Sequence, residues 1–226
     1  MWILESAAWV IGTIVTYLVC VRLYQLSRQF PLFHPLIVCT LLIIVAMYVM
    51  QTSIAQYQQH TYLLTFLLGP ATVALAVPLY HQSRILLAMN WRVVLPIVIA
   101  GIVAPCLSWI SVYLLNAPLD LQMTVMVKSI TTPLAMDTAA LISGIPALAA
   151  VMVISTGIVG AVCGPSLFKI LKVYNHAAQG TALGAVAHAI GTAKAFSISE
   201  QCAAFATLAL CLNGIMTAIL LPVLFA

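Results

Sequence analysis

Long apolar segments recur along the whole chain and constrain its fold more than any other feature. The first extends from Ile3 to Leu26 and the last from Cys202 to Phe225. A helix needs about 20 apolar residues to cross a hydrocarbon layer roughly 30 Å thick. Charged residues make up 5% of the 226, whereas soluble domains carry about 25%. We therefore predict an all-α integral membrane protein in which residues 1–226 form one membrane domain.

The segments predict about six full transmembrane helices and two interrupted segments, with eight simple passes as the alternative. The interrupted segments, 117–143 and 176–198, contain polar residues and helix breakers. Either each one crosses the membrane, or each enters and returns to the same face. A short echo between the halves 1–116 and 117–226 favours an inverted repeat: Leu68–Ala71 is followed about thirty residues on by Ala100–Ala104, and Thr132–Ala135 about twenty-five on by Thr156–Gly160. Interrupted segments at matching places in two halves are typical of transporters built in this way. The six continuous runs are Ile3–Leu26, Leu36–Met50, Leu63–Tyr80, Val93–Leu115, Ile145–Phe168 and Cys202–Phe225.

The positive charges predict an orientation. Cytoplasmic loops carry an excess of Lys and Arg, and every Arg falls inside when the N-terminus is outside. Lys169 and Lys172 also fall inside, but only if 117–143 enters and returns. We therefore favour two re-entrant hairpins that enter from opposite faces. Non-helical backbone at membrane depth is tolerated only where it is buried in protein or lines a watery cavity, so this interpretation implies a cavity.

The strongest polar cluster inside an apolar region lies between Lys128 and Pro133. It combines one cation, a helix breaker and the hydroxyls of Ser129, Thr131 and Thr132. Pro133 suits the first turn of a new helix, and either threonine can cap that turn. The free N–H groups of such a helix start, beside an ammonium group, suit a small carboxylate.

This cluster also has a structural interpretation. Lys128 can extend to the outer surface, and the threonines can bond to backbone carbonyls. Asp137 follows nine residues after Lys128. One carboxylate near one cation in a membrane is a structural ion pair, a proton carrier or a cation ligand, and the sequence leaves these three roles open.

A second cluster contains Gly180, Gly184, His188, Gly191 and Thr192, which share one face if the stretch is helical. Small residues at this spacing let helices approach closely, which is the structural interpretation of the glycines. The imidazole titrates near neutral pH and is therefore a candidate for proton coupling.

Asn213, in the last apolar run, either lines the cavity or bonds to a neighbouring helix.

Other functional classes find no support in the sequence. No HExxH, phosphate-binding loop, dinucleotide motif or nucleophile elbow is present, so we expect neither an enzyme nor a cofactor. The positive charges are scattered, which argues against nucleic acid. The cysteines lie singly in apolar runs, so neither a disulfide framework nor a metal site is expected. They are Cys20, Cys39, Cys106, Cys163, Cys202 and Cys211.

Six segments resemble the signature motifs of a known family. They are Gly69–Tyr80, Lys128–Met136, Gly144–Pro146, Gly157–Ala161, Gly180–Ala193 and Leu212–Gly214. These segments look like those of the LrgB/CidB family, and the resemblance covers nearly the whole chain. It implies a bacterial inner-membrane protein. Members of that family are described as antiholin-like regulators of murein hydrolases and cell lysis, and they are usually encoded beside a smaller LrgA/CidA-type membrane partner.

The resemblance also implies a class of substrate. A plastid relative that fuses both parts is a glycolate/glycerate translocator, and bacterial pairs are linked to pyruvate uptake. The segment 185–187 reads Ala-Val-Ala where the family commonly has Thr-Ala-Ser, and Lys194 stands where Arg is usual, which loses a two-pronged grip on a carboxylate. Asp137 and His188 are candidates for ion coupling. The candidate substrate-binding residues are Lys128, Ser129, Thr131, Thr132, Pro133, His188, Gly191, Thr192 and Asn213.

Two functions remain as hypotheses. The first is a transporter of small monocarboxylates that works by alternating access about a site at mid-membrane, with an LrgA/CidA-type partner. The second is a regulator of lysis that transports nothing itself and acts by assembling in the membrane. A homo-oligomer is compatible with either hypothesis.

Overall fold

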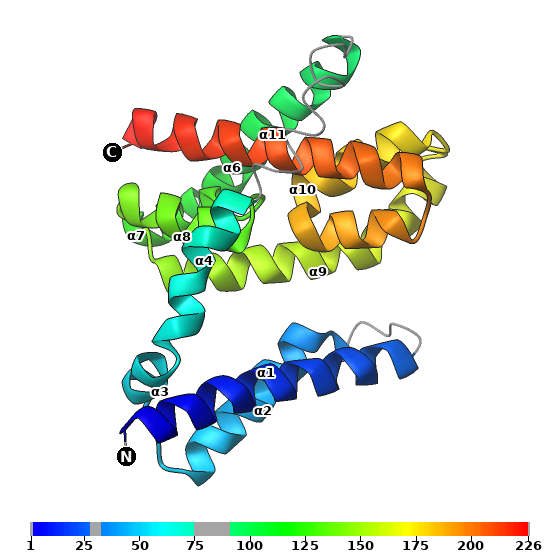
Figure 1. Cartoon of the computed structure of the whole chain (residues 1–226). Helices are drawn as coiled ribbons and strands as arrows, with labels where there is room; N and C mark the ends of the chain where they lie inside the picture. Colours follow the sequence, from blue (N-terminus) through cyan, green and yellow to red (C-terminus); the bar gives the residue numbers. More distant parts are fainter. Residues whose placement is uncertain (1, 28–32, 75–90, 226) are drawn as a thin grey trace. The chain divides into compact units, whose positions relative to one another are not determined.

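The computed structural model describes residues 2–27, 33–74 and 91–225, in which the regular elements are helices and no strand occurs. The chain divides into two compact units, 1–71 and 72–226. Each unit is described by itself, with the element labels of Figure 1. The sequence predicted one membrane domain with the halves 1–116 and 117–226. The two compact units do not test this, and it stays a prediction.

The first unit is built on one long helix that packs against shorter ones. Tyr57 of α3 joins its hydroxyl to Thr13 of α1 at 3.0 Å, and its ring meets Trp9 edge-on. Ser53 begins α3 with a reciprocal capping box to Gln56, the pattern that satisfies two orphan backbone donors. The helices are α1 (Trp2–Leu26), α2 (Pro35–Val49), α3 (Ile54–His60) and α4 (Tyr62–Ala74), which reaches the unit boundary.

The second unit holds six helices in its described part. Pro146 starts α9 in its first turn, where the missing N–H costs nothing. A residue with positive φ follows each of α6, α8 and α9. A residue in the left-handed conformation is a common way to end a helix. The three residues are Asn116, Ser143 and Lys172. The helices are α6 (Trp91–Tyr113), α7 (Leu119–Met126), α8 (Thr132–Leu141), α9 (Pro146–Ile170), α10 (His176–Phe196) and α11 (Glu200–Phe225).

Four described helices, α1, α6, α9 and α11, are long and apolar enough to cross a membrane, and the bent pair α2 and α3 would make a fifth span. The multi-pass all-α fold is thus confirmed. Of the expected run 63–80, residues 75–80 lie outside the described part. Many large apolar side chains face outward, for example Val151 and Ile219. Lipid, unlike water, accommodates such a surface without cost.

The segment after α6 turns back on itself. The side-chain oxygen of Thr124, in α7, accepts a hydrogen bond from the backbone N–H of Ile145, which follows α8, at 2.8 Å. Gly144 also lies against Thr124. The chain therefore enters with α7, turns at 127–131 and returns with α8. We call this the first hairpin; it has the re-entrant form that the charge distribution favours.

α10 is likewise a hairpin and not one straight helix. His188 has φ 42° and ψ −131° and divides the helix into two arms. The second arm returns along the first, because Gly191 packs directly against the backbone of Leu183. The first arm lies on α11, where Gly180 meets Cys202 and Gly184 meets the backbone of Ala206. We call this the second hairpin.

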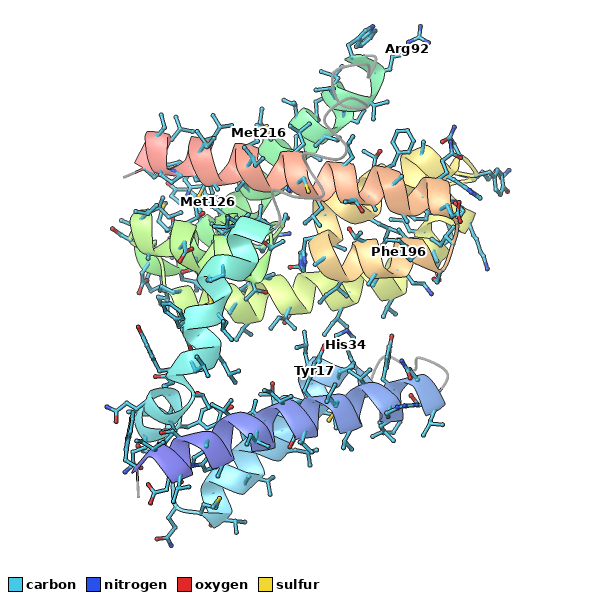
Figure 2. All side chains as sticks on the ribbon, viewed as in Figure 1. Tyr17, His34, Arg92, Met126, Phe196 and Met216 are labelled. Carbon is cyan, nitrogen blue, oxygen red and sulfur yellow. The ribbon has the colours of Figure 1, made fainter. Side chains whose placement is uncertain are left out.

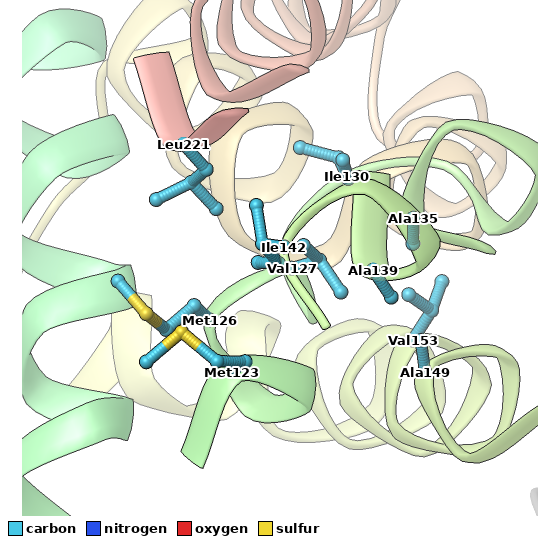
Figure 3. Packing of buried hydrophobic residues seen from close by; sticks show 10 residues of the cluster. All are labelled: Met123, Met126, Val127, Ile130, Ala135, Ala139, Ile142, Ala149, Val153 and Leu221. Carbon is cyan, nitrogen blue, oxygen red and sulfur yellow. The ribbon is translucent and has the colours of Figure 1, made fainter. Parts of the chain in front are cut away.

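The two hairpins enter from opposite ends of the long helices. In Figure 1 the first hairpin lies at one end of α9 and α11, and the second hairpin lies at the other end. The first hairpin packs between α9 and α11 in a buried apolar cluster (Figure 3). Its members are Met123, Met126, Val127, Ile130, Ala135, Ala139, Ile142, Ala149, Val153 and Leu221.

This topology gives the second unit two faces of different charge. One face holds the start of α6, the end of α9 and both ends of the second hairpin; we call it the Arg92 face, after the residue in the first turn of α6 (Figure 2). The other holds the end of α6 and the start of α7, and we call it the Asp120 face. Lys169 and Lys172 follow the path of α9 to the Arg92 face, as the hairpin arrangement requires.

Candidate functional site

The tips of both hairpins meet the middle of α11 at one amide group. Asn213, near the centre of α11, is 1% exposed. Its side-chain N–H groups donate to the carbonyl of Ser129 at 3.1 Å and to the carbonyl of Ala185 at 2.9 Å. One side chain therefore ties the first hairpin to the second. The structure thus shows Asn213 bonding to neighbouring elements through its N–H groups, while its side-chain oxygen is buried without a partner; a substrate role for Asn213 stays a prediction.

The tip of the first hairpin contains two buried hydroxyls without partners. Ser129 and Thr131 are 3% and 6% exposed, and neither side-chain oxygen makes a hydrogen bond. Thr131 is the N-cap residue of α8 but does not cap it with its side chain. A buried hydroxyl without a partner costs about 1–3 kcal/mol. Both hydroxyls are therefore available for a hydrogen bond with a ligand.

The start of α8 lies at the same tip. Pro133 occupies its first turn, as the sequence predicts, and the first helical bond runs from the N–H of Ala135 to the carbonyl of Thr131. The N–H groups of Thr132 and Leu134 thus precede the helical ladder and carry the partial positive charge of a helix start. Anions bind well in such a place.

Lys128 carries a full positive charge and comes four residues before the start of α8. It is partly buried, and its ammonium group forms no ion pair or hydrogen bond with any residue in the described ranges. It lines a cavity of about 640 Å³ between the first hairpin and α6. Lys128 thus borders an open cavity against α6, and its role in binding a substrate stays a prediction.

Two hydroxyls that were not among the predicted site residues line this cavity. Ser108 and Ser111 of α6 border it with Lys128. The hydroxyl of Ser108 donates to the carbonyl of Ala104, and the hydroxyl of Ser111 donates to the carbonyl of Leu107, both at 2.6 Å. Each hydroxyl oxygen can still accept a hydrogen bond. Such bonds are common for serine in apolar helices, and nothing local distinguishes these two from structural serines.

His188 forms the tip of the second hairpin and is 2% exposed. Its Nε2–H donates to the carbonyl of Val153 in α9 at 2.8 Å. The ring lies directly on Gly157, where a Cβ would come within 2.6 Å of Cε1. The hydroxyl of Thr192 donates to the carbonyl of His188 at 2.9 Å. The tip is therefore fixed to α9 from one side and to its own second arm from the other.

The second cluster does not form one helical face, because the helix breaks at His188. Gly180 and Gly184 are contact points with α11, and Gly191 is the contact between the two arms. Close backbone approach thus accounts for all three glycines. A substrate role for Gly191 and Thr192 stays a prediction.

Asp137 lies apart from these groups. Its side chain is exposed on α8, and within the described ranges it forms no ion pair with Lys128. The described residues also include no group of three or more His, Cys, Asp or Glu side chains that could hold a metal ion. The polar groups near the two tips are thus one cation, hydroxyls, a helix start and an amide, but Ser129 and Thr131 are not among the residues that line the cavity of Lys128.

This arrangement defines a class: an all-α multi-pass membrane protein with two interrupted hairpins that meet at mid-depth. Residues 13–226 match the model of the LrgB-like family. The chain belongs to the LrgB-like family, as its sequence motifs predict.

Relatives of similar length support the assignment. The chain is 33% identical over 210 residues to the protein YxaC of Bacillus subtilis (strain 168), covering 90% of this chain and 88% of YxaC. It is 29% identical over 213 residues to the antiholin-like protein LrgB of Bacillus cereus (strain B4264), covering 94% and 93% of the two chains. No solved structure matches the chain.

Proposed function

We propose that this protein transports small monocarboxylates of the pyruvate, glycolate or glycerate type across the cell inner membrane by alternating access. The observation that carries the proposal is the tip of the first hairpin. There the unpartnered hydroxyls of Ser129 and Thr131 lie between Lys128 and the start of α8 along the chain, and Lys128 itself borders a cavity.

The chemistry of these groups matches a carboxylate. Two hydroxyls and the free N–H groups of Thr132 and Leu134 donate hydrogen bonds, and a carboxylate only accepts them. Hydrogen bonds that involve a charged partner are about twice as strong as neutral ones. Lys128 balances the negative charge, which would otherwise be costly at membrane depth. The rest of the cavity is mostly apolar, which suits a compact acid with one charge.

The orientation follows from the charges of the second unit. The Arg92 face also carries Lys169, Lys172 and Lys194 together with Glu200, whereas the Asp120 face carries Asp120 and, in its described part, no Lys or Arg. The positive-inside rule then makes the Arg92 face cytoplasmic. An N-terminus outside the cell and an LrgA/CidA-type membrane partner belong to the same proposal; both come from the sequence and the family resemblance.

Uptake by proteoliposomes tests the proposal. Radiolabelled pyruvate, glycolate and glycerate are offered to vesicles that contain the unaltered protein, Lys128→Ala or Lys169→Ala. We expect saturable uptake of at least one acid, at least a tenfold loss in Lys128→Ala, and normal uptake in Lys169→Ala, whose lysine is exposed at the end of α9. Equal uptake by both lysine variants would contradict a role for the first hairpin.

Thr131→Val separates function from stability. The buried hydroxyl of Thr131 has no hydrogen-bond partner. Replacing it with a methyl group removes this unsatisfied polar atom, so we expect the Tm to stay the same or to rise. The same change removes a donor to the carboxylate and lowers uptake. Thr207→Val is the matched control, because its hydroxyl already donates to the carbonyl of Ala203.

A second candidate function is regulation of cell lysis without transport. The name of the Bacillus cereus relative, antiholin-like protein LrgB, favours it. A regulator of this kind depends on its interfaces and tolerates loss of the interior polar groups. It predicts that bulk added at Gly157 or Gly184 affects function more than loss of Lys128 does.

A further inference from the structure

Two separate cavities of the second unit approach each other at the middle of α6. The first is the cavity of Lys128, about 640 Å³, which extends along α6 to Ser111 and Val112 near the Asp120 face. The second, about 540 Å³, begins at Arg92 and Asn175 on the Arg92 face. α6 has 23 residues and is therefore roughly 35 Å long, close to the hydrocarbon thickness of a membrane.

Both cavities are lined by the same two residues at their inner ends. Ala100 of α6 and Val186 of the second hairpin border each of them. The first cavity thus leads from the Asp120 face to this pair, and the second leads from the Arg92 face to it. Each cavity has a basic side chain in its wall, Lys128 in one and Arg92 in the other.

The second hairpin is firmly held on either side of Val186. The carbonyl of Ala185 accepts a hydrogen bond from Asn213, and the ring of His188 donates to the carbonyl of Val153. Both anchors are buried, where hydrogen bonds are costly to break. If Val186 and Ala100 separate, we therefore expect α6 to move and the second hairpin to stay in place.

α6 is weakened at this level. Pro96 and Pro105 lie inside the helix, and a proline cannot donate to the carbonyl four residues earlier. The carbonyl of Gly101 therefore lacks its usual helical partner. Gly101 faces α11, where a Cβ would collide with Met216 and come within 2.6 Å of the Asn213 side-chain oxygen. Kinks in helices occur at such proline and glycine positions.

We propose that the two cavities are the two halves of one anion path, and that Ala100 and Val186 form its constriction, which α6 opens by bending about Gly101. This inference rests on the proposed transport function and adds the route and the gate. The path has a basic group on each side of the constriction, so that an anion is attracted from either face.

Labelling with a charged, membrane-impermeant thiol reagent tests the path. Thr181→Cys places a thiol in the cavity of the Arg92 face, and Ser111→Cys places one in the cavity of the Asp120 face; the unaltered protein gives the background of the native cysteines. We expect Thr181→Cys to react only from the cytoplasmic side and Ser111→Cys only from outside. If neither thiol reacts, or both react from the same side, the two-sided path is wrong.

Added bulk tests the constriction. In Val186→Trp we expect uptake to fall at least tenfold while the thiols of both cavities remain reactive. Val151→Trp is the control, since Val151 is an exposed valine of α9 and borders neither cavity. Ala100→Leu repeats the test from α6 if Val186→Trp does not fold. Normal uptake in a folded constriction variant would overturn the gate.

The failure of this inference can be told apart from the failure of the proposed function. The labelling requires no transport, so opposite-sided reaction without any uptake would contradict the proposed substrates and leave the path in place. Uptake that depends on Lys128 but is unaffected by bulk at Ala100 and Val186 would contradict the constriction alone.

Discussion

At the scale of single residues, the conformation of His188 is the feature that departs most from ordinary chemistry. Its φ of 42° and ψ of −131° belong to a region that glycine adopts freely and other residues adopt at a cost of about 1–3 kcal/mol. The ring is held by Val153 and Gly157. The protein therefore keeps a strained residue where a glycine would fit the backbone better.

A pair of variants measures this strain. His188→Gly and His188→Ala both lose the ring and its hydrogen bond, and they differ only in a Cβ. We expect the glycine variant to be more stable than the alanine variant by about 1 kcal/mol, because relief of strain outweighs the greater flexibility of glycine in the unfolded chain. Thermal unfolding in detergent gives the difference. An alanine variant as stable as the glycine variant would show that the backbone is not strained.

At the scale of elements, the sequence predicted the first hairpin better than the second. Pro133 and the polar cluster mark the turn from α7 to α8, and such a break needs only local chemistry. The break at His188 has no proline beside it. It depends on contacts with Val153 and Gly157, which lie more than 30 positions away, so a helical face was the natural but incomplete interpretation.

The bridge made by Asn213 was likewise beyond local reasoning. A lone asparagine in an apolar helix indicates a polar contact but does not reveal the partner, and here the partners are the carbonyls of Ser129 and Ala185. The same holds for Ser108 and Ser111, whose place beside Lys128 arises from the packing of α6 against the first hairpin.

Loss of the bridge has a predictable effect on both hairpins. Asn213→Ala removes a donor from two buried carbonyls, and a lost buried hydrogen bond costs about 1–3 kcal/mol. We expect a lower Tm and faster hydrogen exchange at both 127–131 and 185–189. Asn175→Ala is the control, because Asn175 caps α10 at an exposed position and its loss costs about 1 kcal/mol. Faster exchange in one hairpin only would contradict the bridge.

At the scale of the whole molecule, a single constraint explains the main features of the second unit, which is the small number of charged residues. These features are the apolar outer surface, the two opposed hairpins and the difference in charge between the two faces. A chain with 5% charged residues must satisfy its backbone within helices. It interrupts them only where protein surrounds the break, and both breaks lie at buried tips. The buried polar side chains of the two tips and of α11, among them Ser129, His188 and Asn213, are thereby gathered inside the second unit.

Direct binding tests this account most simply. Pyruvate, glycolate and glycerate are titrated by calorimetry into the purified protein, Lys128→Ala and Lys169→Ala. We expect at least one acid to bind the unaltered protein and Lys169→Ala equally, and to bind Lys128→Ala at least tenfold more weakly, a loss of about 1.4 kcal/mol. Equal affinity for both lysine variants, or no binding of any acid to the folded protein, would contradict the carboxylate site at the first hairpin.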